Sequence, residues 1–116
     1  MFDHDKLDVY QCALAIVDLV DEILDQMPKG RAHLKDQLDR SATSIVLNIA
    51  EGAGEFSRAD KQRFYRMARR SATESAATLD IARRKHAPPE MLANARGHLV
   101  RVVAMLVRMT QSSQRR

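Results

Sequence analysis

The sequence is poor in cysteine, tryptophan and long apolar segments. A single cysteine among 116 residues excludes an intrachain disulfide and a zinc site built from several thiolates. No uninterrupted apolar run exceeds six residues, as at Val102–Val107, whereas about 20 are needed to cross a bilayer. Asp3, Asp5 and Asp8 stand where a secretory signal has basic and apolar residues. We therefore expect a cytoplasmic protein without a membrane span.

Glycine and proline are also scarce, with four and three residues, and most of them fall where helices are expected to begin or end. Apolar residues recur with helical periodicity along the rest of the chain, and no alternating strand pattern occurs. Helices are predicted over residues 6–27, 32–52, 58–86 and 89–111. Such helices with short connections favour an all-α, antiparallel up-down-up-down four-helix bundle, with residues 1–116 forming one domain. Residues 112–116 are expected to be a frayed tail.

The third helix has a recognisable start and a small-residue face. Ser57 and Asp60 form a variant of the capping box that satisfies free amides at a helix N-terminus. The residues expected to face inward are Phe64, Met67, Ala68, Ser71, Ser75, Leu79 and Ala82. Because the middle of this face is small, we expect a neighbouring helix to approach closely.

The fourth helix carries more apolar surface than the core of a four-helix bundle uses. Beside its core face lies a second apolar face, which consists of Ala93, Val100, Ala104 and Val107. Monomers seldom expose large contiguous apolar patches, so we expect this face to contact another copy of the chain. The alternative is a helix buried unusually deeply in a small monomer.

Charge is distributed unevenly along the chain. Residues 1–39 carry 4 Lys/Arg and 9 Asp/Glu, whereas residues 40–116 carry 15 and 6. Basic residues gather on and beside the third helix, at Arg58, Lys61, Arg63, Arg66, Arg69, Arg70, Arg83, Arg84 and Lys85. The planar guanidinium group suits phosphate, so this surface is predicted to bind the backbone of RNA or DNA. With five aromatic residues, stacking of bases is disfavoured. The alternative is a solvated face, or one that meets the acidic first helix of another subunit.

A polar stripe runs beside the core face of the second helix. It consists of Gln37, Arg40, Ser44, Asn48 and Glu51, and Glu74 borders the core on the third helix. We expect a buried polar layer in which Asn48, Glu51 and Glu74 bond to adjacent helices or subunits and fix their register. The alternative, a ligand or catalytic site, is disfavoured because no His, Cys or Lys completes an acid-base set.

No recognised catalytic or metal-binding constellation is present. Each glutamate is followed three residues later by a residue other than histidine, which excludes the Glu-x-x-His pairs of di-metal bundles. The segment Gly52–Gly54 follows a helix and lacks the strand and the Lys-Ser/Thr of a phosphate-binding loop. We therefore predict a protein with no enzymatic activity, no metal and no cofactor.

Several strings in the second and third helices form a specific combination. They are Gln37, Arg40 and Ser44-Ile45 within Leu34–Gly52, the string Asn48-Ile-Ala-Glu-Gly52, then Arg63-Phe-Tyr65, and Ala68-Arg-x-Ser71-x-x-Glu74. This combination resembles the 23S ribosomal RNA intervening-sequence protein family, and the resemblance extends over nearly the whole chain from Leu7 onward.

The resemblance implies a four-helix bundle that assembles as a homopentamer, without enzymatic activity or cofactor. Members are encoded within intervening sequences of bacterial ribosomal RNA genes or serve as accessory proteins of diversity-generating retroelements. The retroelement members bind nucleic acid and a reverse transcriptase. Expected partners are therefore other copies of the chain, RNA or DNA, and a reverse transcriptase. The alternative is a structural or protein-binding oligomer with no direct contact to nucleic acid.

Overall fold

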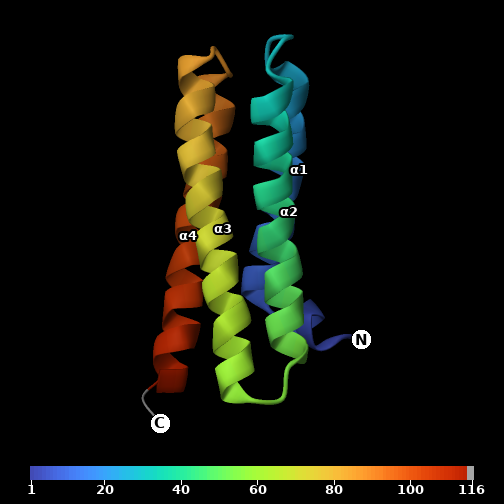
Figure 1. Ribbon diagram of the computed structural model, residues 1–116, viewed down its shortest axis with the longest axis vertical. Coiled ribbons are helices and arrows are strands. Elements are labelled where there is room, and N and C mark those ends of the chain that lie inside the picture. Colours follow the sequence, from blue (N-terminus) through green and yellow to red (C-terminus); the bar gives the residue numbers. More distant parts are fainter. Residues whose placement is uncertain (115–116) are drawn as a thin grey trace.

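The computed structural model describes the backbone of residues 1–114 and the side chains of residues 1–111. Its elements are the 3-10 helix η1 (Asp3–Lys6) and the α-helices α1 (Asp8–Gln26), α2 (Ala32–Gly54), α3 (Arg58–Arg84) and α4 (Pro89–Gln114). Successive α-helices run in opposite directions along one long axis (Figure 1). The prediction of an all-α four-helix bundle is confirmed, with helix ends within three residues of those expected.

Two boundary predictions are wrong. Helix α4 continues to Gln114, three residues past its predicted end, and residues 115–116 of the predicted tail lie outside the described residues. Helix α2 continues to Gly54, so Gly52 lies inside the last turn of this helix rather than beyond its end.

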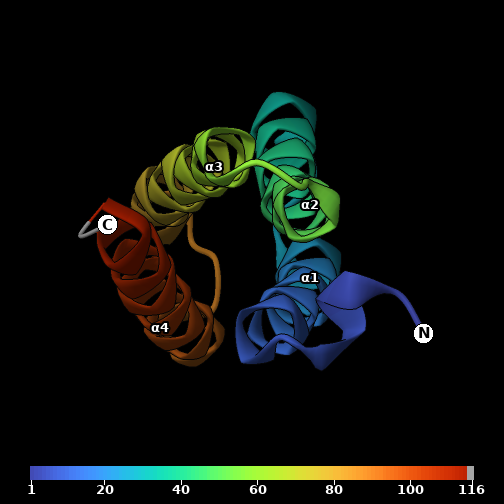
Figure 2. The same ribbon diagram turned by 90° about the horizontal axis from the view of Figure 1, so that it is seen from below.

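The helices are arranged in a ring in which each contacts the two that precede and follow it, with α4 closing onto α1 (Figure 2). The contact between α2 and α3 is the most extensive. Every α-helix contributes buried apolar side chains to one core. The largest fully buried side chains include Ile16, Ile23, Leu38, Ile45, Ile49, Leu99 and Leu106. Among the described residues, no helix is both long and apolar enough to cross a membrane.

Both ends of α3 are capped. The predicted N-cap is confirmed, because the amide of Asp60 donates to Ser57 Oγ at 3.1 Å. At the other end, His86 takes a positive φ of 70°, a conformation that glycine usually supplies at this position. The amides of His86 and Ala87 donate back to the carbonyls of Arg83 and Ala82, which is the Schellman arrangement.

The buried face of α3 differs in part from the predicted one. Ala68, Ser75, Leu79 and Ala82 are buried as expected, and so are Tyr65, Ala72 and Thr78, which were not expected there. By contrast, Met67 is 41% exposed, and Phe64 and Ser71 are half-buried. The core face is therefore rotated towards Tyr65, and the prediction for Phe64 and Met67 is wrong.

The missing side chain of Gly52 explains why Tyr65 turns inward. A Cβ atom added to Gly52 would lie 2.7 Å from Cε1 of Tyr65 and 3.2 Å from Cβ of Phe64, so the tyrosine ring occupies the space over this glycine. Burial also raises the pKa of the Tyr65 phenol, since the charged form loses hydration.

The α2–α3 seam, which we define as the contact line between these helices, holds two serine pairs. Ser41 Oγ and Ser75 Oγ are 2.8 Å apart and buried, and Ser44 Oγ and Ser71 Oγ are 2.9 Å apart nearer the surface. Side chains this short bond across the seam only if the two helices lie close together. The expected close approach of a neighbouring helix to α3 is therefore confirmed.

We expect Gly52→Ala to destabilise the fold by about 1–3 kcal/mol, because the new methyl group overlaps the Tyr65 ring. Alanine favours helix by up to about 1 kcal/mol over glycine, and Gly54→Ala should show only that gain, since nothing lies within 4 Å of its added Cβ. Thermal unfolding followed by circular dichroism measures both variants. Equal stabilisation by both would contradict the packing of Tyr65 over Gly52.

Candidate nucleic-acid interface

The nine basic residues predicted to form one surface fall into two groups on α3. The first group lies in residues 58–70 and the second in residues 83–85, of which Lys85 is the C-cap residue of α3. The seven arginines are exposed, and the two lysines are half-buried. The intervening segment carries Glu74 and Asp80 instead. At 1.5 Å per residue, Arg70 and Arg83 are separated by about 20 Å along the helix. The predicted basic surface is therefore interrupted.

Lys61 stabilises α2 rather than standing free for a ligand. Its Nζ donates to the carbonyl oxygens of Gly52 at 3.2 Å and Ala53 at 3.0 Å. These carbonyls belong to the last turn of α2, where a positive charge is favourable. The Gly52 carbonyl also accepts from the Glu55 amide at 3.2 Å. Lys61 therefore ties the start of α3 to the end of α2.

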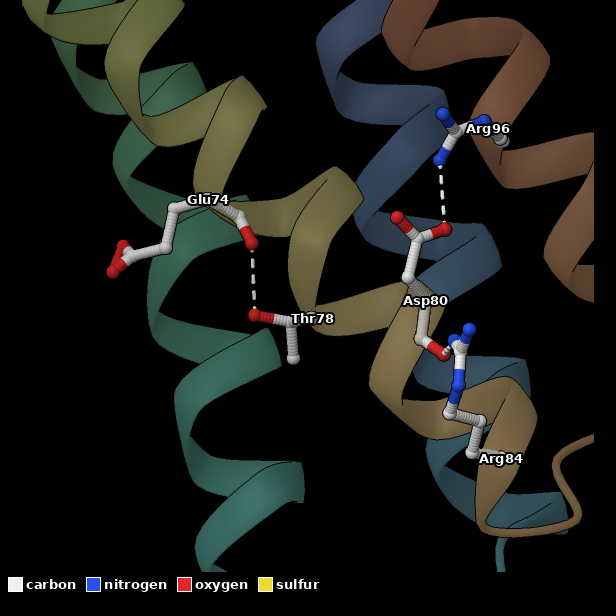
Figure 3. A network of polar contacts seen from close by, with 5 residues as sticks. All are labelled: Glu74, Thr78, Asp80, Arg84 and Arg96. Atoms are coloured by element: carbon white, nitrogen blue, oxygen red, sulfur yellow. Dashed lines mark hydrogen bonds and ion pairs between the residues drawn. The ribbon is translucent and has the colours of Figure 1, made fainter.

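Other basic residues have local partners. Arg63 lies over the ring of Phe64, at 4.6 Å, and 3.8 Å from the Asp60 carboxylate. Arg84 donates to the backbone carbonyl of Asp80 at 3.0 Å, and the Asp80 carboxylate accepts from Arg96 of α4 at 2.9 Å (Figure 3). This last contact lies between α3 and α4. The second basic group is thus next to a carboxylate that already has a partner.

Arg66, Arg69 and Arg70, which we call the arginine triad, lie within one turn of α3. Arg58 and Arg83 are likewise exposed and without a side-chain partner among the described residues, but each stands apart from the triad along the chain. The three residues of the triad are exposed, and within the described part of the chain their guanidinium groups make no hydrogen bond or ion pair. Their spacing of three and four residues places them on one side of α3 within a single turn. The triad is therefore the part of the predicted surface with the most unpaired positive charge.

The polar stripe is not a layer buried within the chain. Gln37, Arg40, Glu51 and Glu74 are exposed, so the prediction of burial is wrong for both glutamates. The buried polar position between α2 and α3 is taken by the Ser41–Ser75 pair, whose hydroxyl groups satisfy each other at lower desolvation cost than a carboxylate. Bonds from the stripe to another subunit stay a prediction.

Apart from the bond between Ser44 Oγ and Ser71 Oγ of α3, the bonds of the stripe are local. Arg40 lies 3.8 Å from Asp36 of its own helix. The Asn48 amide nitrogen donates to the Ser44 carbonyl at 2.9 Å and to Ser44 Oγ at 3.0 Å. Neither Glu51 nor Glu74 has a side-chain partner among the described residues.

An open groove follows the outer side of the α2–α3 seam. It consists of two adjoining hollows of about 390 and 370 Å³ that share Ser44, Ser71 and Glu74. The α2–α3 groove is lined by His33, Asp36, Gln37, Arg40, Ser41, Ser44, Asn48, Met67, Arg70, Ser71 and Glu74. Most of the polar stripe and one member of the arginine triad therefore meet here. Met67 and Ser71 were expected in the core but line the groove instead. Glu74 was expected at the border of the core, and this position was the one signal in the sequence for the edge of α3 at which the groove lies.

The second apolar face of α4 is at the surface, as expected. Val100 is 63% exposed, Ala93 and Ala104 are exposed, and Val107 is half-buried. Gly97 lies on the same side, and a Cβ there would meet nothing within 4 Å. Nothing within the chain thus requires a glycine in the middle of this helix.

The four histidines and the lone cysteine do not gather into a site. No group of three or more His, Cys, Asp or Glu suited to holding a metal ion occurs among the described side chains. Cys12 is buried, and its thiol donates to the His98 carbonyl of α4 at 3.7 Å. Burial raises the pKa of this thiol, and the charge of Arg101 opposes the shift. This contact joins α1 to α4.

Comparisons with known proteins give one family and one fold. Residues 5–108 match the family described as 23S rRNA-intervening sequence protein. A crystal structure of a protein of unknown function from the S23 ribosomal protein family of Bacteroides thetaiotaomicron is similar, with a TM-score of 0.79 at 21% identity. The match covers 88% of this chain and 97% of that one, and at this identity it shows the fold. No curated protein matches the chain.

Lys61→Met should lower stability by about 0.3–1 kcal/mol, because two carbonyls at the end of α2 lose a charged donor. The matched substitution Arg66→Met removes the same charge from an exposed residue of the same helix and should leave stability nearly unchanged. Urea unfolding of both variants makes the comparison. An equal loss in both would mean that Lys61 is not a cap.

Proposed function

We propose a function for a chain that belongs to the 23S rRNA-intervening sequence protein family: a cytoplasmic, non-enzymatic homo-oligomer that binds the backbone of RNA or DNA through α3. The arginine triad carries this proposal. Its three guanidinium groups are exposed and have no partner among the described residues, although Asp and Glu side chains are present nearby on α3. Such groups can replace the counterions around phosphates, so their binding should depend strongly on salt.

Self-assembly is supported by a difference in charge between the two halves of the bundle. Residues 1–54 carry 5 Lys/Arg and 10 Asp/Glu, whereas residues 55–116 carry 14 and 5. Helix α1 has no basic residue, and its exposed acids are Asp8, Asp18, Asp21, Glu22 and Asp25. The α1–α2 and α3–α4 halves lie on opposite sides of the molecule (Figure 1). A head-to-tail ring, such as the pentamer that the resemblance implies, would bring unlike charges together.

The exposed face of α4 supports the same assembly. Ala93, Gly97, Val100 and Ala104 follow one another at helical spacing along the surface, and a glycine inside a helix costs up to about 1 kcal/mol relative to alanine. Small side chains let a second helix approach closely, which would offset that cost in an oligomer.

A second candidate function follows from the same charge difference. The arginine triad would then face acidic side chains of a protein, such as a neighbouring copy or a reverse transcriptase. The protein would be a structural or protein-binding oligomer without direct contact to nucleic acid. This candidate differs from the first in the partner of the triad and not in the assembly.

Replacing the arginine triad by glutamine should abolish most nucleic-acid binding. The plot of log K against log salt concentration between 50 and 200 mM has a negative slope, and we expect the magnitude of that slope to be smaller by about 2–3 in the variant. Each phosphate that the variant no longer neutralises makes the slope less steep by close to one unit. Fluorescence anisotropy with a mixed-sequence RNA and a DNA of equal length measures the slope. The control variant, with Arg31, Arg101 and Arg108 changed to glutamine, removes the same charge from exposed positions outside α3.

Two outcomes decide between the candidates. Binding that weakens equally in both variants would reduce the effect to net charge and contradict a role for the triad. An assembled wild-type protein that binds neither RNA nor DNA at 50 mM salt would favour the second candidate.

Val100→Glu should dissociate the oligomer, because a carboxylate would be buried in the contact without a partner. Light scattering should report the mass of an assembly for the wild type and of one chain for the variant. Helical circular dichroism should be retained, since Val100 is exposed within the chain. The control Gln26→Glu adds the same charge at the exposed end of α1. A wild type that runs as a monomer would overturn the interpretation of α4.

A further inference from the structure

The α2–α3 groove contains an exposed carboxylate, that of Glu74, which makes no bond among the described residues. Glu74 lines both hollows of the groove, and its carboxylate points away from Thr78 and from the Asp80–Arg96 pair (Figure 3). Only its backbone carbonyl is engaged, by Thr78 Oγ1 at 2.8 Å. Arg40 and Arg70 line the same groove, and yet neither lies within ion-pair distance of Glu74. Two acceptor oxygens are therefore open to a ligand.

A second acceptor in the groove is the side-chain oxygen of Asn48. The orientation of this amide is set by its surroundings, because the atom 2.9 Å from the Ser44 carbonyl must be the nitrogen. That nitrogen uses its hydrogens on the Ser44 carbonyl and on Ser44 Oγ. Oδ1 is left without a partner among the described residues. The hollow lined by Asn48, Met67, Arg70 and Glu74 thus offers three unpaired acceptor oxygens beside the guanidinium donors of Arg70.

These acceptors select the chemistry of a ligand. A phosphate is disfavoured beside Glu74, because two negative charges would meet. A cationic side chain of a partner protein is disfavoured by Arg70 in the groove and by Arg66 and Arg69 beside it on α3. A neutral group that presents several N–H donors satisfies both constraints. Among the parts of a nucleic acid, only the bases provide such groups.

Guanine fits this requirement better than the other bases. Its Watson–Crick edge presents two adjacent donors, the N1–H and the 2-amino group, which match the two oxygens of one carboxylate. Adenine, cytosine and uracil each present donors at a single position on that edge. The hollow that contains Asn48, Met67 and Glu74 is lined by no aromatic ring, and His33 lines only the other hollow. The base would therefore be held by its edge, with the exposed Met67 side chain against its face.

We propose that the α2–α3 groove binds an unpaired guanine through Glu74 and Asn48, next to the phosphates held by the arginine triad. This inference rests on the proposed function, because the backbone contact brings the base to the groove. Arg70 belongs to both sites and would set the distance between phosphate and base. The groove adds a preference for single-stranded guanine to binding that is otherwise independent of sequence.

Inosine tests the proposal, because it differs from guanosine only by lacking the 2-amino group. Anisotropy is measured with a 12-residue oligouridine that carries one central guanosine, one central inosine or neither, and with the oligothymidine counterparts. We expect guanosine to be bound about tenfold more tightly than inosine, as for removal of half of a bidentate pair with a base. The RNA and DNA arms keep the central base and change the sugar, together with the 5-methyl group of the flanking thymines.

Glu74→Gln should abolish the preference and reduce the ratio of the guanosine and inosine affinities to near one. Glu22→Gln, an exposed glutamate of α1, makes the same chemical change and should leave the ratio unchanged. Both side chains lie outside the core, so both variants should fold, and circular dichroism checks this.

The outcomes separate this inference from the proposed function. Equal binding of all three oligonucleotides by the wild type would overturn the guanine site and leave backbone binding intact. The same result follows if Glu74→Gln retains the preference. If no oligonucleotide binds at 50 mM salt, the proposed function fails, and the guanine site fails with it.

Discussion

Close contact between α2 and α3 is the constraint on which the rest of the structure depends. Short side chains make it: Ser41 bonds to Ser75 across the seam, and Gly52 leaves room for the Tyr65 ring. Overlap that forces either helix outwards would break the bond between the two serine hydroxyl groups, and each hydroxyl would keep only its bond to a carbonyl of its own helix. The seam therefore fixes the rotation of α3 about its axis. That rotation decides which residues of α3 face the core and which face solvent.

The outer surface of the bundle follows from the same rotation. With Tyr65 inside, Met67 and Arg70 come to line the groove beside α2, and the triad of Arg66, Arg69 and Arg70 faces solvent. Basic residues of α3 then divide by role. Lys61 caps a helix and Arg84 donates to the Asp80 carbonyl of its own helix, whereas the triad has no partner within the described residues. Charge on a helix surface is thus a poor guide to binding until the contacts of each residue are known.

Part of the site was predictable and part was not. Residue types and helical spacing placed the arginines on the exposed side of α3, because an apolar core excludes unpaired charge whatever its exact register. The helical pattern could not show whether Phe64 or Tyr65 is buried, since both are aromatic and adjacent in sequence. The space over Gly52, which the Tyr65 ring occupies, decides between them. The polar stripe was placed inside for a similar reason. Its residues border the core face. A rotation of the helix about its axis, by less than the angle between successive residues, decides whether they form a buried layer or line an open groove.

The sequence by itself determined the four helices, their order and the N-terminal cap of α3, since these depend on periodicity and on residues close along the chain. It also determined the separation of charge between the two halves. Tertiary structure alone decided the rotation of α3, the pairing of serines and the meeting of Glu74, Asn48 and Arg70 in one groove. These depend on distances between residues that are far apart in sequence, and such distances are set by how side chains fill the space between two helices.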